Sequence, residues 1–104
     1  MSEARLVRDK VPLIMRRRGE HPIVRTAEPY EYAGLLRAKL VEEVEEFLDT
    51  DDPHELADVM EVLLALGRIL GCDSADLERM RSEKANERGG FADRLVWSGN
   101  ESAA

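Results

Sequence analysis

The chain has little of several features that other classes of protein need. Its 104 residues include one cysteine, Cys72, which rules out an intrachain disulfide and fits a reducing cytoplasm. No apolar run approaches the length of a transmembrane span, and the first ten residues are too polar for a signal peptide. Positive charge is also scarce, and the net charge of −7 argues against binding to a nucleic-acid polymer or an anionic membrane.

The length and composition fit one small globular domain. Hydrophobic residues make up 43% of the chain and charged residues 36%, as expected for a protein with much solvated helix surface. We expect this domain over residues 1–98 and a disordered tail over residues 99–104. A phosphate-bearing substrate stays open despite the negative charge, because a bound metal ion reverses the local field.

Apolar periodicity and helix-end signals predict an all-α fold. The predicted helices span about 11–18, with Asp9 as N-cap, and about 29–48, 53–70 and 74–88. The two central helices are joined by the short polar stretch 49–52, so they should form an antiparallel hairpin over about 29–70. Residues 59–66 are apolar nearly all round. One hairpin and two flanking helices cannot cover them, so we expect oligomerisation to complete a core of the four-helix-bundle type.

Acidic residues are threaded through the apolar faces of this hairpin. On a helical wheel of roughly 100° per residue, Glu43 falls on the apolar stripe of the first helix, and Glu45 points the opposite way. In the second helix an acid recurs at every third residue. The acids that flank or follow the stripe are Glu42, Glu46, Glu55, Asp58 and Glu61.

The hairpin geometry predicts that these acids meet in pairs. Glu46 and Glu55 lie equally far from the turn, and Glu43 and Asp58 lie one helical turn further away. Buried carboxylates without partners cost several kcal/mol each, so such a group needs cations. Oxygen ligands suit Mg²⁺ or Mn²⁺. Simpler interpretations remain open, namely a solvated charged face, pairing with arginines, and for Glu55 the third position of a capping box.

The last predicted helix turns basic on its apolar side. Lys84 and Arg88 fall close to the direction of Leu77 and precede Gly89-Gly90. Two cations one turn apart before a flexible segment predict a phosphate clamp. The alternative is that both side chains extend from an apolar face into solvent.

With these residues in view, the chain resembles the MazG-like, all-α nucleoside triphosphate pyrophosphohydrolase superfamily, which also contains phosphoribosyl-ATP pyrophosphohydrolase and dimeric dUTPases. The superfamily motif is Glu-x-x-Glu followed by Glu-x-x-Asp, matched here by residues 43–46 and 55–58. Residues 6–12 and 84–91 resemble a small single-domain branch, and the similarity covers residues 5–96. Only eight residues separate Glu46 from Glu55, fewer than is typical, which leaves substrate choice and the number of metal ions open.

The resemblance implies an enzyme that needs Mg²⁺, or Mn²⁺ in its place, and cleaves a nucleoside triphosphate between the α and β phosphates. The implied catalytic residues and metal ligands are Glu43, Glu46, Glu55 and Asp58, with Glu42 and Glu61 as further candidate ligands. The candidate phosphate ligands are Lys84, Arg88, Arg8 and Lys10. The candidates for base recognition are Tyr30, Tyr32, Phe91 and Trp97. The implied partners are a nucleotide and further copies of the chain. Two alternatives remain: phosphoribosyl-ATP cleavage in histidine synthesis, and a non-catalytic helical interaction module.

Overall fold

The computed structural model describes residues 4–102 and confirms an all-α chain. Four helices follow one another in these described residues: α1 (Val11–Arg17), α2 (Pro29–Thr50), α3 (Pro53–Ile69) and α4 (Ser74–Arg88). The helices lie within two residues of their predicted bounds, and the described part of the chain contains no strand. None of its helices is long and apolar enough to cross a membrane.

Local side-chain contacts explain where most of these helices begin. Glu28 and Glu31 form a reciprocal capping box at the start of α2, and Asp73 and Asp76 form another at the start of α4. The N-cap predicted for α1 was wrong, because that position is Lys10 rather than Asp9 and no side chain caps the helix. Pro12 lies in the first turn of α1, and its ring fixes the backbone φ angle near the helical value. The helix therefore begins without a capping carboxylate.

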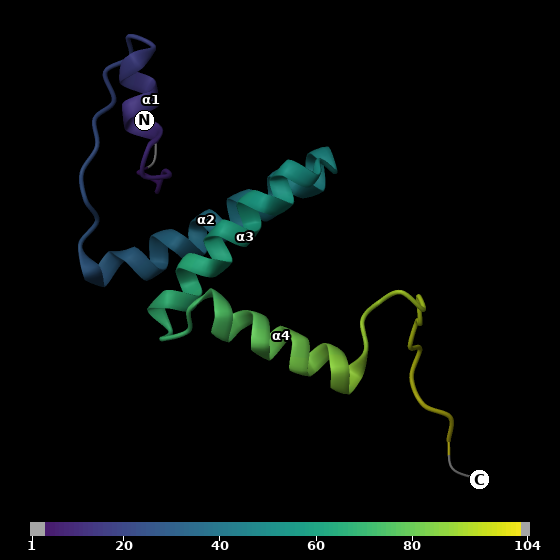
Figure 1. Cartoon of the computed structure of the whole chain (residues 1–104). Coiled ribbons are helices and arrows are strands. Elements are labelled where there is room, and N and C mark those ends of the chain that lie inside the picture. Colours follow the sequence, from purple (N-terminus) through teal and green to yellow (C-terminus); the bar gives the residue numbers. More distant parts are fainter. Residues whose placement is uncertain (1–3, 103–104) are drawn as a thin grey trace.

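The antiparallel hairpin of α2 and α3 is the central element and is confirmed (Figure 1). Asp51 ends α2 in the left-handed region at φ 52°, which lets the chain reverse within two residues. Leu36 of α2 and Val62 of α3 are the buried large apolar residues of the described chain, and each keeps a few per cent of its surface exposed. Glu43 is buried beside them, so the hairpin contact carries an acid within its small core.

The flanking helices cover little of this hairpin. α4 packs on the end of α3, where Gly67 is buried against Leu77 and Cys72, and then runs away from the hairpin (Figure 1). A Cβ atom at Gly67 would lie 2.6 Å from Leu77 Cδ1, so glycine permits this close approach. Within the described chain α1 packs on none of the other helices. The four helices that the structure describes therefore do not close a bundle by themselves.

The chain is consequently open. Its radius of gyration is 18.9 Å, against about 13 Å for a compact domain of this length. Its accessible surface is 9466 Å², against about 5,900 Å² for a compact monomer of this mass. Residues 99–102 of the predicted tail form no helix, and residues 103–104 lie outside the described chain, as do residues 1–3 of the polar N-terminal segment.

Candidate functional site

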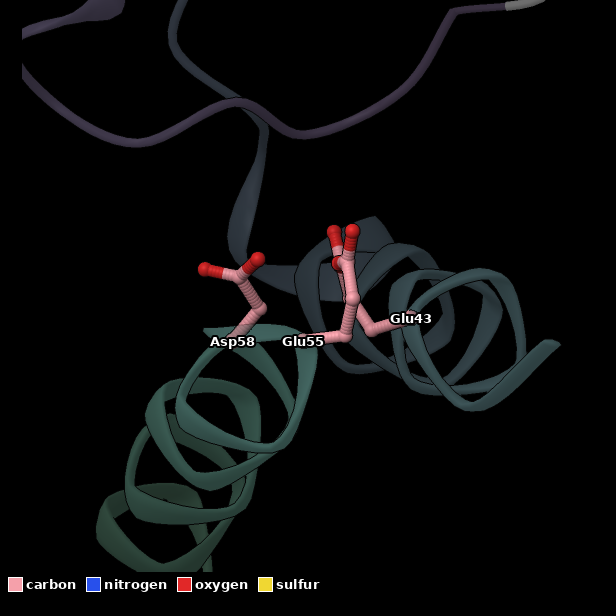
Figure 2. A group of neighbouring side chains, drawn as sticks. All are labelled: Glu43, Glu55 and Asp58. Atoms are coloured by element: carbon pink, nitrogen blue, oxygen red, sulfur yellow. The ribbon is translucent and has the colours of Figure 1, made fainter. Parts of the chain in front are cut away.

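Three carboxylates from the two hairpin helices converge. Glu43 projects from α2, and Glu55 and Asp58 project from α3 on the same side of the hairpin (Figure 2). One oxygen of each lies within 4.8 Å of the others. Glu43 is only 7% exposed, whereas Glu55 and Asp58 are half-buried. We call these three residues the acidic cluster.

Helical phase explains why these acids meet. Glu55 and Asp58 are three residues apart, so they lie on one face of α3, and Glu43 lies on the buried stripe of α2 that faces α3. Glu55 does not serve as a capping-box partner. Asp52 accepts a hydrogen bond from the backbone N–H of His54, but α3 has no reciprocal box. The carboxylate of Glu55 therefore belongs to the cluster rather than to the helix end.

Glu46 lies beside the cluster and interacts with it electrostatically. The charge of Glu43, with partial desolvation and a hydrogen bond between the two side chains, raises the pKa of Glu46. Desolvation and the nearby charges of Glu46 and Asp58 likewise raise the pKa of Glu55. Because like charges and burial both disfavour the ionised forms, this group of acids favours a bound cation.

Two cationic side chains already contact the cluster. Lys39 Nζ lies 3.1 Å from Glu43 Oε1, and Arg8 Nη2 donates a hydrogen bond of 2.6 Å to Asp58 Oδ1. Arg8 belongs to the N-terminal segment, whose residues 6–9 line the same cleft as the acids. Arg8 and Asp58 are both substantially solvated, with exposed side-chain fractions of 55% and 39%, so their contact can open at low cost.

The cleft that holds the cluster has a volume of about 580 Å³. Its lining includes Glu46 and Glu61, which were predicted, and Tyr32, which was a candidate for base recognition. A cleft of this size matches the usual range for a small-molecule site. It therefore offers carboxylate oxygens for a hard cation, an arginine for an anion, and one aromatic ring.

Glu42 lies elsewhere, although it was predicted as a further ligand. It accepts a hydrogen bond of 2.8 Å from Arg5 and one of 3.3 Å from Lys39. It lines a second hollow of about 540 Å³ that contains none of the acidic cluster. Glu45 lines that second hollow as well, and it is exposed as its helical phase predicts.

The predicted phosphate ligands divide in the same way. Arg8 lines the acidic cleft, whereas Lys10 is the exposed N-cap of α1 and lies outside the lining. Lys84 and Arg88 are exposed on α4, which departs from the hairpin, and neither lines the cleft. The same is true of Tyr30, Phe91 and Trp97, which are 87%, 98% and 79% exposed.

Lys39 and Arg68 are cleft residues that the sequence interpretation did not select. The sequence could have indicated Lys39, because it lies four residues before Glu43 and so shares its helix face. The sequence indicates Arg68 less directly, because Arg68 lies two helical turns beyond Glu61 on the same face of α3. The extended N-terminal segment has no periodicity that would predict its position over the cleft.

The donor set fits a hard divalent cation. All three members of the acidic cluster offer oxygen, the ligand atom that Mg²⁺ and Mn²⁺ prefer, and no histidine or thiol joins them in the described chain. A cation here would offset the repulsion that raises the pKa of Glu46 and that adds to the effect of desolvation on the pKa of Glu55. The burial of Glu43 separates this group from an ordinary solvated run of acids.

No family model matches the chain. A curated relative, an uncharacterised protein of Mycolicibacterium smegmatis, is 46% identical over 48 residues. The matched region is 46% of this chain and 49% of that protein, so the similarity spans about half the length of each. No solved structure matches.

Proposed function

We propose that the acidic cleft binds Mg²⁺, or Mn²⁺ in its place, and that the protein hydrolyses a nucleoside triphosphate between its α and β phosphates. The products would be a nucleoside monophosphate and pyrophosphate, as in the superfamily that the sequence resembles. The observation that carries this proposal is the convergence of Glu43, Glu55 and Asp58 within 4.8 Å from two helices. Clearance of unwanted nucleotides from the cell is a role that would suit this chemistry.

Each acid has a distinct place in the proposed reaction. Glu43, Glu55 and Asp58 supply the oxygen ligands, while Glu46 lies beside them with a raised pKa. When bound, the metal ion would neutralise the triphosphate and lower the pKa of a coordinated water. Glu46 is then suited to accept that proton on its carboxylate, because a raised pKa makes it a better base near neutral pH. Glu61 lines the cleft as a candidate for a further ligand.

Arg8 is the cation best placed to bind phosphate. Its guanidinium already donates a hydrogen bond to Asp58, so a short movement would transfer that hydrogen bond to a phosphate oxygen. Tyr32 is the aromatic residue of the cleft that could stack on a base. Lys84 and Arg88 would reach the substrate only from a second copy of the chain or after a movement of α4. The proposal includes self-association and a cytoplasmic location. A single free cysteine fits the reducing conditions of the cytoplasm.

Two alternatives make different predictions. Phosphoribosyl-ATP would use the same cleft and the same chemistry, so it is an alternative substrate. A helical interaction module would not catalyse anything, and it is favoured by the large apolar side chains exposed on the hairpin, among them Leu48 and Met60.

The test is a substrate panel with detection of pyrophosphate, run with Mg²⁺ and with a chelator. The panel contains the common nucleoside triphosphates, damaged or unusual ones, and phosphoribosyl-ATP. We expect metal-dependent release of pyrophosphate from at least one of them, and loss of release in Asp58→Ala. Failure to release pyrophosphate from any substrate, together with no heat on calorimetric titration of Mg²⁺ or Mn²⁺, would favour the interaction module.

A further inference from the structure

The N-terminal segment crosses the acidic cleft and forms an ion pair with each helix of the hairpin. Arg5 donates a hydrogen bond of 2.8 Å to Glu42 of α2, and three residues later Arg8 donates one of 2.6 Å to Asp58 of α3. We call residues 5–9 the strap. All of it except Arg5 lines the acidic cleft, and Figure 2 shows the N-terminal segment passing over the three carboxylates.

The strap has little apolar contact to hold it on the hairpin. Leu6 is half-buried, whereas Val7 is 41% exposed and the remaining residues of the strap are exposed as well. The helix that follows the strap, α1, packs on none of the other described helices. Because so little apolar surface is buried, the two arginine ion pairs are the main attachment of the strap to the hairpin.

The two cations that touch the acidic cluster differ in how firmly they are held. The side chain of Lys39 is only 18% exposed, and its Nζ lies 3.1 Å from Glu43 and 3.3 Å from Glu42, both on its own helix. The side chain of Arg8 is 55% exposed and reaches Asp58 from an extended segment. A solvated ion pair is weak, so Arg8 is the cation that a competing ligand can displace.

We propose that Arg8 is a latch that a divalent cation displaces. In the metal-free protein Arg8 neutralises Asp58, and binding of the cation to the acidic cluster releases Arg8 to bind a phosphate group of the nucleotide. The physical reason is that a guanidinium and a divalent cation on one carboxylate bring like charges together. The inference rests on the metal site proposed above and adds an order of binding, with the metal ion first and the nucleotide second.

The other arginine of the strap keeps a released Arg8 close to the cleft. Arg5 pairs with Glu42, which lies outside the lining of the acidic cleft, so a cation bound to the acidic cluster leaves this contact in place. The strap is then tethered at Arg5 and free at Arg8. Loss of Arg8 should therefore strengthen metal binding and weaken phosphate binding, whereas a strap with a merely structural role would not change the two affinities in opposite directions.

Two titrations of Arg8→Gln test these opposite effects. With Mn²⁺ alone we expect binding about two- to fivefold tighter than in the wild type, the scale of a lost solvated ion pair. With inorganic tripolyphosphate at saturating Mg²⁺, calorimetry should show binding about tenfold weaker, the scale of a lost hydrogen bond between charged groups. The matched control is Arg5→Gln, which removes the same charge from the same strap and should change Mn²⁺ affinity less than about twofold.

A spin label on the strap keeps the inference testable if Arg8→Gln does not fold. Val7→Cys in a Cys72→Ser chain leaves one thiol, on a partly exposed residue of the strap, for a nitroxide label. Mg²⁺, which is diamagnetic, should make this label more mobile in electron paramagnetic resonance, because the strap is released at Arg8. The same label on Ile23→Cys, at a fully exposed residue between α1 and α2, should not respond to Mg²⁺.

The outcomes separate this inference from the metal site on which it rests. Mn²⁺ binding by Arg8→Gln that equals or falls below that of the wild type would overturn the latch and leave the metal site standing. Equal tightening in Arg5→Gln, or a label at residue 7 that ignores Mg²⁺ in a chain that binds Mn²⁺, would do the same. Absence of Mn²⁺ binding in the wild type and both variants would overturn the latch together with the metal site.

Discussion

Glu43→Gln is the substitution that most sharply separates a metal site from an ordinary acidic helix. The side chain keeps its size and its packing against the hairpin core but loses the charge that a divalent ion needs. Glu43 is 7% exposed and shares the cluster with Glu55 and Asp58. A charge pair about 4 Å apart is worth roughly 1 kcal/mol in water and roughly 4 kcal/mol at an effective dielectric constant near 20.

Because Glu43 is buried, the energy of its interaction with a bound cation should lie toward the upper end of that range. We therefore expect a rate loss of at least about 100-fold, which corresponds to about 2.7 kcal/mol of transition-state stabilisation. The metal-free fold should change by no more than about 1 kcal/mol, because Lys39 keeps its contact with Glu42 when its contact with Glu43 is weakened. The increase in melting temperature on adding Mg²⁺ should largely disappear.

The matched control is Glu45→Gln, two residues away on the exposed side of the same helix. It removes the same charge from the same run of glutamates, and we expect less than a threefold change in rate. Both variants should be measured over a range of Mg²⁺ concentrations, since excess metal can partly rescue a weakened site. A damaging Glu45→Gln with a silent Glu43→Gln would refute the assignment of the cleft.

Three further predictions follow from individual contacts. Asp58→Ala should abolish turnover and leave the metal-free protein at least as stable in thermal unfolding. The substitution removes one negative charge from a group of acids, and the ion pair with Arg8 that it also removes is largely solvated. A large loss of stability would contradict this. The raised pKa values of Glu46 and Glu55 mean that both carboxylates lose their destabilising charges on acidification. The melting temperature of the metal-free protein should therefore rise as pH falls from about 7 toward about 5. Changing both residues to Gln should remove that rise. Gly67→Ala should lower stability by about 1 kcal/mol in chemical denaturation, because the clash of its Cβ with Leu77 outweighs the better helix propensity of alanine; increased stability would show that α4 can shift freely.

The sequence predicted the hairpin and the phase of its acids well, because both follow from regular helix geometry. Glu43 is buried and Glu45 is exposed, as a period of 3.6 residues requires. The meeting of Glu43 with Asp58 follows from the short turn, which fixes the two helices in register. Glu46 was predicted level with Glu55 and lies beside the cluster rather than in its closest group.

The parts that sequence reasoning could not place depend on contacts between distant segments. The wheel gave the face on which Lys84 and Arg88 lie, but it carries no information on the direction in which α4 leaves α3. The N-terminal segment is extended, so no periodicity predicted that Arg8 would contact Asp58, although the resemblance had indicated Arg8 as a candidate. The position of the first N-cap was wrong for a local reason, since Asp9 lies one residue too early.

The most direct test of the central claim is a titration with Mn²⁺ in which the free ion is measured by electron paramagnetic resonance. Mn²⁺ stands in for Mg²⁺ because both are hard cations that prefer oxygen ligands. We expect saturable binding to the wild-type chain, binding at least tenfold weaker in Glu43→Gln, and wild-type affinity in Glu45→Gln. Weak and identical binding by all three proteins would contradict the claim that the acidic cluster is a metal site.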